Sequence, residues 1–368
     1  MSSIDKLFEL PEYSINNEEK RNLLLSELSK LTQFHYSNCI PYKSIIDNLE
    51  IAPDQSFNNI ADVPFIPVRM FKSQKIQSIP DEEVIKVLTS SGTTNQQVSR
   101  IALNKETSML QVKALSSIIT SYLGNKRLPM IIIDSDVVLK SKSSMSARGA
   151  GLIGLSNFGR NHFFALDENM NLKTDEFIEY IEKYKSEPIL IFGFTFMVWQ
   201  YLYKRFNESG KKADLRSAVL IHSGGWKKLI DQAVTNERFK EELFNQFSIK
   251  KVYNFYGMVE QVGSIYMECE QGYLHAPNFA EILIRSYEDW SVLPVGEKGV
   301  IQTISVLPKS YPGHSLLTED LGTITGIDNC KCGRKGTYFL ISGRVPKAEL
   351  RGCSDIHAET VLNSAEAR

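Results

Sequence analysis

The sequence predicts an α/β fold, with a core of mostly parallel sheets and helices joined to a smaller β-rich subdomain. Short apolar runs alternate with helical patterns along most of the chain, which is typical of a parallel sheet. After about residue 272 the chain changes to short strands separated by glycine and proline turns. We therefore expect a core over residues 1–271, including an N-terminal helical segment. The β-rich subdomain is expected over residues 272–368 and ends in a short segment containing Cys353.

The elements of the core are expected in a definite order. Asn17 precedes a segment in which leucines recur every three or four residues, so a helix is expected to begin there. Another helix is expected around residues 177–184, and Gly193 is expected to form a turn before an amphipathic helix. The strands expected in the core are residues 84–90, 130–134, 189–192, 218–222 and 252–255. Those expected in the β-rich subdomain are residues 279–286, 299–307, 322–327 and 336–343.

Charge and hydropathy exclude several classes of protein. The 368 residues include 42 Lys and Arg against 43 Asp and Glu, a net charge of −1 that suits neither a polybasic nucleic-acid binder nor an acidic disordered tail. The longest apolar stretch, residues 188–203, contains Thr195 and Gln200 and is shorter than the roughly 20 residues of a membrane span. The first ten residues already carry charges and do not resemble a signal peptide. We expect a cytoplasmic protein with no membrane span and no nucleic-acid partner.

Five cysteines, an odd number, favour thiol or metal chemistry in a reducing compartment over a disulfide framework. Four residues on two segments form a candidate zinc set: Cys269, His275, Cys330 and Cys332. Zinc takes four sulfur or nitrogen ligands in a tetrahedron, and such a site would brace a subdomain with few helices. The alternative is that these are ordinary turn cysteines and a surface histidine, because no spacing rule joins the two segments.

A polar loop of sequence TSSGTT, residues 89–94, follows the first strand expected in the core. Hydroxyl groups and a glycine allow several donors to converge on one anion, which is one way of binding a phosphate. The loop is not a Walker A motif, because no Gly-Lys-Ser/Thr follows Gly92. Taken alone, it is better explained as a polar surface turn.

A second glycine pattern, Gly149, Gly151 and Gly154, matches G-x-G-x-x-G. A dinucleotide-binding fingerprint requires its first glycine directly at the end of a strand. Here a long serine-rich loop separates the pattern from the strand that ends near residue 134. We interpret this segment as a small-residue stretch that permits close packing.

Three later turns change the interpretation of the polar loop. They are the sequences SGGWKK (223–228), YGMVE (256–260) and TEDLG (318–322), and a Gly-Arg pair at 343–344 follows them. In this order, together with the polar loop, they resemble the motifs of the adenylate-forming (acyl-AMP) superfamily. The resemblance covers residues 88–353 and implies that the fold is the N-terminal core of that superfamily. It also implies ATP and Mg²⁺ as cofactors and a carboxylic acid as the substrate.

The same resemblance implies roles for individual residues. It implies a nucleotide site formed by Ser90, Ser91, Gly92, Thr93, Thr94, Gly224, Gly225, Tyr256, Gly257, Asp320 and Arg344. Residues 90–94 would hold the leaving pyrophosphate, and the two glycines would let the backbone approach the adenine and the acyl group. Tyr256 would stack on the base, Asp320 would accept the ribose hydroxyls, and Arg344 would donate nearby. Glu260 would bind Mg²⁺ and so take part in catalysis. Each carboxylate taken alone is explained equally well as a solvated surface group.

The segment RVPKAELRGC (344–353), together with GGWKK (224–228), resembles the acyl-protein synthetases of the LuxE type. In that family the acyl group passes from its adenylate to a cysteine of the enzyme and then to a partner such as a reductase or carrier protein. The resemblance implies that Cys353 is the catalytic nucleophile, and Lys347 or Arg351 could lower the pKa of its thiol. The alternative for a lone cysteine is a buried structural role.

Departures from the superfamily pattern leave other functions open. Val259 and Glu319 stand where the motifs have Thr and Gly, and Pro346 is inserted after the Gly-Arg pair. We expect the full C-terminal lid domain and its catalytic lysine to be absent. Similarity to phenylacetate-CoA ligase-like proteins allows an acyl- or aryl-CoA ligase that uses coenzyme A as acceptor. A third alternative is a partner protein in a biosynthetic pathway that only binds nucleotide. The aromatic segments beside the expected pocket suit an alkyl chain or a ring, and a fatty acid is the expected substrate.

Overall fold

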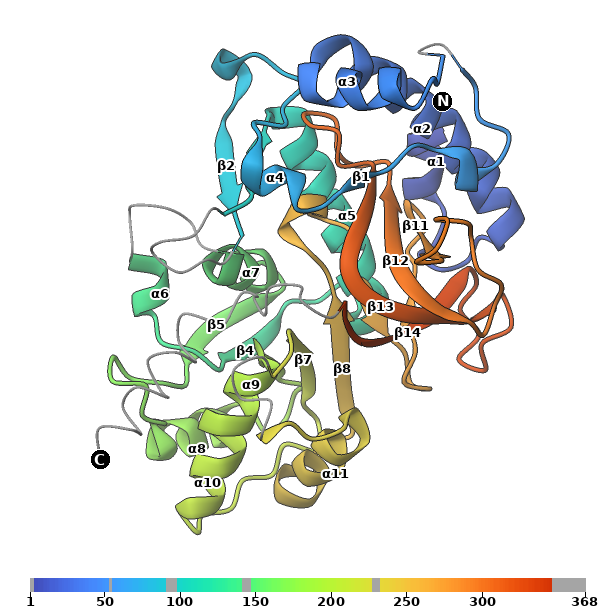
Figure 1. Ribbon diagram of the computed structural model, residues 1–368. Coiled ribbons are helices and arrows are strands. Elements are labelled where there is room, and N and C mark those ends of the chain that lie inside the picture. Colours follow the sequence, from blue (N-terminus) through green and yellow to red (C-terminus); the bar gives the residue numbers. More distant parts are fainter. Residues whose placement is uncertain (1–2, 53–54, 91–97, 141–146, 227–231, 346–368) are drawn as a thin grey trace. The chain divides into compact units, whose positions relative to one another are not determined.

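The computed structural model describes residues 3–52, 55–90, 98–140, 147–226 and 232–345 (Figure 1). These residues form two compact units, and each unit combines segments that are far apart in the sequence. The first, called the antiparallel unit here, contains residues 3–52, 55–89, 98–122 and 256–345. The second, called the parallel unit, contains residues 90, 123–140, 147–226 and 232–255. The division of the chain at residue 271 stays a prediction from the sequence.

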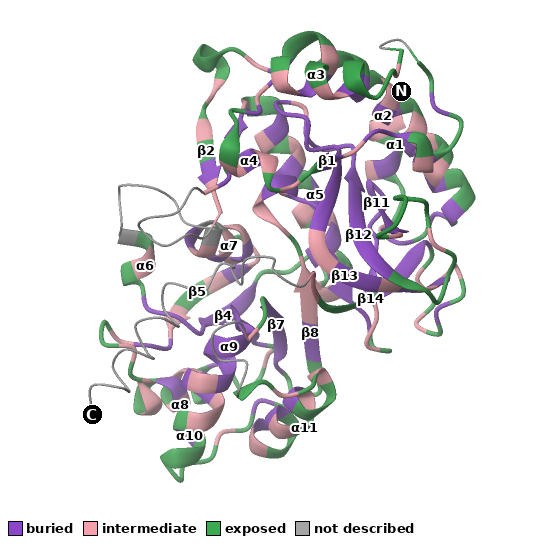
Figure 2. Cartoon of the chain, in the orientation of Figure 1, coloured by how far each residue is buried: buried purple, intermediate pink, exposed green. Residues whose placement is uncertain are grey.

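The parallel unit is built on five parallel strands in the order β5-β4-β6-β7-β8. They are β4 (Leu128–Ile132), β5 (Gly159–Phe164), β6 (Leu190–Phe194), β7 (Val219–Ser223) and β8 (Lys251–Tyr256). The helices are α6 (Val137–Lys140), α7 (Ala147–Ser156), α8 (Thr174–Lys183), α9 (Thr195–Met197), the π-helix η3 (Val198–Lys204), α10 (Arg205–Glu208) and α11 (Asn236–Phe247). Every residue of β4, β6 and β7 is buried, as expected for a parallel sheet covered on both faces (Figure 2).

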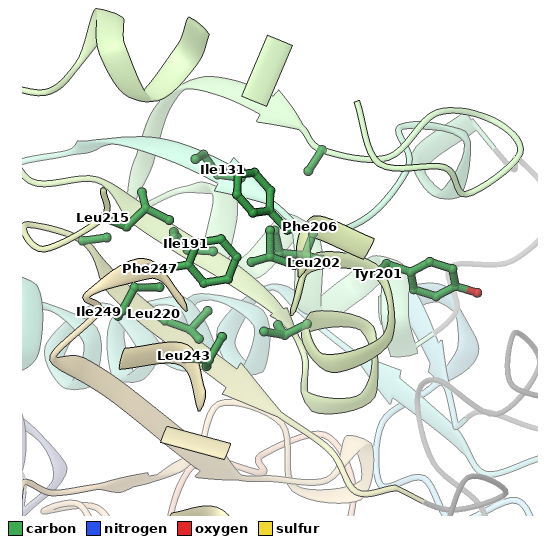
Figure 3. Packing of buried hydrophobic residues seen from close by; sticks show 14 of the residues in the cluster. Ile131, Ile191, Tyr201, Leu202, Phe206, Leu215, Leu220, Leu243, Phe247 and Ile249 are labelled. Atoms are coloured by element: carbon green, nitrogen blue, oxygen red, sulfur yellow. The ribbon is translucent and has the colours of Figure 1, made fainter. Parts of the chain in front are cut away.

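The core of the parallel unit is a cluster of apolar side chains from the strands and the surrounding helices. Ile191 and Leu220 come from the sheet, whereas Phe206 and Phe247 come from helices α10 and α11 (Figure 3). The rings of Phe206 and Phe247 lie 5.0 Å apart, edge to face. Burying each such side chain stabilises the fold by about 1.5–3 kcal/mol. This packing fixes the carboxyl ends of the parallel strands, where the polar turns of the sequence begin.

The main sheet of the antiparallel unit has the strand order β11-β12-β13-β14-β10-β9, and β1 is added by pairing with β13 in parallel. They are β1 (Ile66–Pro67), β9 (Tyr266–Glu268), β10 (Leu274–His275), β11 (Ala280–Arg285), β12 (Lys298–Ser305), β13 (Ser315–Ile327) and β14 (Thr337–Arg344). A separate hairpin joins β2 (Lys86–Thr89) to β3 (Arg100–Leu103). The helices are α1 (Ser3–Glu9), α2 (Asn17–Asn38), α3 (Ile40–Asn48), α4 (Met70–Ser73) and α5 (Lys105–Leu123), with short 3₁₀ turns η1 (Ile60–Asp62), η2 (Asp81–Glu83) and η5 (Val259–Gln261).

One local prediction is confirmed by the structure and one is corrected. Helix α2 begins at Asn17, as predicted, and is capped by Asn16, whose side chain accepts from the Glu19 N–H at 2.9 Å. The Asn17 side chain is buried and donates to Glu281 and Thr337. Gly193 lies inside strand β6 and does not form a turn. A Cβ atom there would lie 2.8 Å from Ile133, so the glycine serves close packing.

The predicted α/β fold is confirmed, because the chain contains a parallel sheet with helices and a region of short antiparallel strands. Each strand expected from the sequence overlaps a strand of the structure. The G-x-G-x-x-G pattern lies in helix α7 and not in a turn that follows a strand. This position agrees with its interpretation as a packing segment. Within the described residues, no helix has both the length and the apolar character needed to cross a membrane.

Candidate functional site

Two neighbouring strands and the end of a third bring together three residues predicted from the sequence. Asp320 lies in β13 and pairs with Arg344, the last residue of β14. Tyr256 is the last residue of β8 and the first residue of the antiparallel unit. We call Tyr256, Asp320 and Arg344 the Asp320 site. The sequence predicted all three residues but could not show that they contact one another.

Hydrogen bonds fix the Asp320 carboxylate at both oxygens. The Tyr256 hydroxyl donates to Oδ2 at 2.7 Å, and Arg344 Nε donates to Oδ1 at 3.1 Å. Burial, followed by the charge of Asp320, raises the pKa of Tyr256 well above its usual value, so the phenol stays protonated and remains a donor. The backbone N–H of Asp320 donates to Thr318 Oγ1 at 3.1 Å. Two hydrogen bonds to the carboxylate and one from the backbone of Asp320 therefore hold this side chain in one orientation.

The Asp320 site remains accessible. The Asp320 side chain is 19% exposed and that of Arg344 is 32% exposed. A carboxylate offers about four lone-pair positions, and the contacts given above use two of them. The remaining positions can accept hydroxyl groups of a ligand, which agrees with the role expected for Asp320 at a ribose.

Two charged residues beside this site were not identified as functional from the sequence. Arg69 Nη2 lies 3.0 Å from Glu319 Oε1, and Arg344 Nη2 lies 3.8 Å from Glu319 Oε2. Arg69 follows β1, which pairs in parallel with β13 through Ile66 and Leu316. That long-range pairing brings Arg69 to the site, and no local pattern in the sequence indicates it. The result is a polar region in which two arginines flank Glu319.

Glu260 lies in the short turn η5 and is buried, with 7% of its surface exposed. Burial raises the pKa of its carboxyl group, while a hydrogen bond with Ser99 and the charge of Lys72 act in the opposite direction. The negative charge of Glu319 also raises this pKa, because the two carboxylates repel each other. Carboxylate oxygens are the ligands that Mg²⁺ prefers, and a divalent cation would relieve this repulsion. The residues present therefore fit the Mg²⁺ expected at Glu260.

Gly224 and Gly225 belong to the parallel unit and follow strand β7 directly. Gly224 has φ +84°, a left-handed conformation that favours glycine. At Gly225 a Cβ atom would meet no atom within 4 Å, and both residues are exposed. A ligand could therefore approach the backbone closely here, as expected for the Gly-Gly turn. In the antiparallel unit, Gly257 is also exposed, and a Cβ atom there would lie 3.1 Å from Ile265.

Several predicted site residues lie outside the described residues. They are Ser91, Gly92, Thr93 and Thr94 of the polar loop and the expected nucleophile Cys353. Ser90 is described, is partly buried, and directly follows strand β2. The roles of these residues stay predictions.

The candidate zinc set is brought together within the antiparallel unit. One ligand atom from each of Cys269, His275, Cys330 and Cys332 lies within 4.8 Å of all the others. Cys269, His275 and Cys330 are buried, and Cys332 is partly buried. The four residues are called the Cys/His cluster below.

A family model described as "Acyl-protein synthetase, LuxE" matches residues 1–362. Two curated relatives carry the name "Long-chain-fatty-acid--luciferin-component ligase". The one from Vibrio harveyi is 21% identical over 351 residues, which cover 92% of this chain and 88% of the relative. The one from Aliivibrio fischeri is 21% identical over 329 residues, which cover 84% of this chain and 81% of the relative.

Solved structures with a similar fold include 2-hydroxyisobutyryl-CoA ligase in two states. An open conformation in complex with the acyl adenylate 2-HIB-AMP and CoA has a TM-score of 0.71 at 16% identity, covering 92% of this chain and 78% of that chain. The postadenylation state in complex with 2-HIB-AMP has a TM-score of 0.70 at 17% identity, covering 94% of this chain and 73% of that chain. At this identity the likeness shows the fold, which is that of an adenylate-forming ligase.

Proposed function

Since the chain belongs to the acyl-protein synthetase (LuxE) family, we propose that it activates a fatty acid with ATP and transfers the acyl group to its own Cys353. The observation that carries the proposal is the Asp320 carboxylate, held by Tyr256 and Arg344 with acceptor positions left for a ligand. This arrangement lies within the ordered set of motifs that resembles the adenylate-forming superfamily. The names of the two curated relatives support a long-chain fatty acid as the substrate.

In the first step, an oxygen of the fatty-acid carboxylate attacks the α-phosphorus of ATP. The bond between that phosphorus and the bridging oxygen of the β-phosphate breaks, and pyrophosphate leaves with the electron pair. The products are acyl-AMP and pyrophosphate. Such a displacement requires positioning and charge neutralisation more than covalent help from the protein.

The residues of the antiparallel unit supply positioning in this step. Asp320 accepts hydroxyl hydrogens of the ribose, and the hydrogen bond from Arg344 orients its carboxylate. Tyr256 donates to Asp320 and offers its ring to the base. Ring contacts with Tyr266 at 6.0 Å and Phe339 at 6.4 Å support the Tyr256 ring. Glu260 would hold Mg²⁺, and the ion would supply positive charge to neutralise the phosphate oxygens. By resemblance to the superfamily, residues 90–94, Gly224 and Gly225 are also proposed to bind the nucleotide.

In the second step, the thiolate of Cys353 attacks the carbonyl carbon of acyl-AMP. The bond from that carbon to the phosphate oxygen breaks, AMP leaves, and a thioester remains on the enzyme. Such a thioester can pass its acyl group to an acceptor protein, as the family description implies. An acceptor protein such as a reductase or carrier is therefore the proposed partner.

Intact-mass spectrometry of the full chain tests the covalent step. After incubation with ATP, Mg²⁺ and tetradecanoic acid, the wild type should gain the mass of one acyl group, and hydroxylamine should remove it. Cys353→Ser should show no gain under the same conditions. Cys39→Ser is the matched control, because Cys39 is a buried cysteine in another part of the chain and should leave the adduct unchanged.

Two results would contradict the covalent step. One is a chain that forms acyl-AMP but never gains the acyl mass, and the other is an adduct that persists in Cys353→Ser. If AMP release by Cys353→Ser depends on added coenzyme A, the acyl-CoA ligase is the correct function instead.

A further inference from the structure

We propose that the Cys/His cluster binds one zinc ion in a closed, structural site that secures the turn between strands β13 and β14. The four ligands would be Cys269 Sγ, His275 Nε2, Cys330 Sγ and Cys332 Sγ. This site lies entirely in the antiparallel unit and does not depend on the proposed acyl transfer.

The fold brings the ligands together from two turns of one sheet. Cys269 directly follows β9, and His275 lies in β10, which pairs with β9 on one side and β14 on the other. Cys330 and Cys332 lie in the connection between β13 and β14. Tight turns make the approach feasible, because Gly272 and Gly333 have φ +82° and +87°, values that favour glycine. Strand pairing thus places two segments about 60 residues apart in the sequence around one point.

Two of the six distances between ligand atoms match the edges of a zinc tetrahedron, and all six lie within 4.8 Å. Zn–S bonds of about 2.3 Å and Zn–N bonds of about 2.0 Å place two sulfurs about 3.8 Å apart and a sulfur and a nitrogen about 3.5 Å apart. The distance from Cys269 Sγ to Cys330 Sγ is 3.9 Å, and that from Cys332 Sγ to His275 Nε2 is 3.5 Å. The cluster therefore needs little adjustment to bind the ion.

The chemistry of the ligand set selects the metal and the kind of site. Three sulfur ligands and one imidazole form the Cys₃His set that zinc occupies in structural sites. Four protein ligands leave no open position for water or substrate, so the ion would not take part in catalysis. The cysteines are free thiols in the structure, and three of the four ligand residues are buried. Without a metal, Nε2 of the buried His275 ring has, among the described residues, only the sulfur of Cys332 as a partner, and a thiol is a weak hydrogen-bonding group.

Surrounding groups support thiolate ligands. The backbone N–H of Gln271 donates to Cys269 Sγ at 3.4 Å. The guanidinium of Arg334 hydrogen-bonds to Cys332 and also to Glu270, where Nη1 donates to Oε2 at 2.6 Å. A zinc ion with three thiolates and a neutral imidazole carries one net negative charge. Arg334, whose side chain is 16% exposed, is placed to balance that charge.

The site would connect the hairpin to elements from other parts of the chain. The Arg334 guanidinium lies 4.5 Å from the centre of the Tyr122 ring on α5. The Lys335 N–H donates to the carbonyl of Tyr13 at 2.8 Å. The His275 ring stacks on Tyr338 of β14 at 5.5 Å. Zinc at this position would fix the connection from 328 to 336 against β9, β10 and the N-terminal segment.

Metal analysis of the full chain tests the proposal. Protein produced in zinc-supplemented medium and purified without chelators is analysed by inductively coupled plasma mass spectrometry. We expect about one zinc per chain in the wild type. The double variant Cys330→Ser/Cys332→Ser should contain at least about tenfold less, because half of the ligands are gone. Cys39→Ser is the control for loss of a buried cysteine outside the cluster and should keep the wild-type zinc content.

X-ray absorption spectroscopy of the wild type provides a test that does not depend on folding of a variant. We expect three sulfur neighbours at about 2.3 Å and one nitrogen neighbour at about 2.0 Å around zinc. Cobalt substitution should give the visible spectrum of a tetrahedral thiolate site. The proposal is wrong if the wild type produced in zinc-supplemented medium contains no zinc, or if the double variant contains as much zinc as the wild type. It is also wrong if the absorption spectrum shows only oxygen and nitrogen neighbours around zinc. A disulfide between Cys269 and Cys330 in freshly purified protein would also contradict it.

Discussion

The two ends of the β13–β14 hairpin carry polar groups of opposite character. At one end, Asp320 pairs with Arg344, and both side chains are partly exposed. At the other end, Cys330 and Cys332 lie in the turn and meet Cys269 and His275, most of them buried. The first end offers unused acceptor positions, whereas the second offers a complete set of ligands.

This difference separates two uses of polar residues in one element. Groups that are held in position but remain accessible can bind a ligand that comes and goes. Groups that are buried and complete as a ligand set can hold an ion that stays and stabilises the fold. Substitutions at the Asp320 site should therefore affect activity, and those at the Cys/His cluster should affect stability.

The largest expected effect is on stability at the Cys/His cluster. Loss of zinc in Cys330→Ser should lower the free energy of unfolding by about 4 kcal/mol, because binding energy of a structural metal is folding energy. Urea unfolding followed by tryptophan fluorescence measures this change. Cys39→Ser should lower it by no more than about 1 kcal/mol, since it changes one buried atom and releases no metal. Equal losses in the two variants would remove the distinction between the ends of the hairpin.

The next effect is on activity at the other end. Asp320→Ala removes the acceptor of the ribose hydroxyls and should lower kcat/KM for ATP about 100-fold, since hydrogen bonds to a charged group contribute about 1.5–3 kcal/mol each. Steady-state kinetics of pyrophosphate exchange measure it. Asp289→Ala is the control, because Asp289 is an exposed aspartate that bonds to Ser291 in its own loop. A large loss of stability in Asp320→Ala, with little loss of activity per folded molecule, would show that Asp320 supports the fold and does not bind the ribose.

A smaller effect isolates the hydrogen bond between Tyr256 and Asp320. Tyr256→Phe keeps the ring but removes the donor at 2.7 Å, and should raise KM for ATP about fivefold, or about 1 kcal/mol. Tyr36→Phe is a matched control, because the Tyr36 hydroxyl of α2 donates to Asp47 of α3 at 2.8 Å in an exposed pair that includes none of the site residues. If the two variants change KM equally, the hydroxyl of Tyr256 does not position Asp320.

The smallest effect is expected at Arg69, which pairs with Glu319 but is 69% exposed. Arg69→Gln should change the free energy of unfolding by less than about 0.5 kcal/mol, because solvent and salt screen such a pair. Unfolding in low and high sodium chloride measures the change, which should shrink as salt rises. A loss of several kcal/mol that is independent of salt would show that the polar region around Glu319 is structural.

Local pattern was sufficient to predict much of the fold. Apolar runs predicted the buried strands β4, β6 and β7 because a parallel sheet buries both faces of each strand, and they also predicted β8, which is partly buried. Helix α8 followed from its three-to-four-residue periodicity. The error at Gly193 came from tertiary packing. Gly193 packs against Ile133, a contact that no local window contains.

Prediction of the site was limited in the same way. The ordered motifs included Asp320, Arg344 and Tyr256, and the cysteine and histidine residues on two segments suggested the Cys/His cluster. The distances that join each group depend on strand pairing over long separations, which spacing does not encode. Arg69 was missed because only the pairing of β1 with β13 brings it to Glu319. The pKa of Glu260 likewise depends on three residues from separate segments, Lys72, Ser99 and Glu319.

Acid-dependent exchange of labelled pyrophosphate into ATP tests the central claim most directly. The full chain should catalyse exchange only when a carboxylic acid is present, with long-chain fatty acids among the active members of an acid panel. Asp320→Ala should reduce the exchange about 100-fold, whereas Cys353→Ser should retain it, because acyl-AMP forms before the thiol acts. Exchange that no acid in the panel stimulates, or that Asp320→Ala leaves unchanged, would contradict the account.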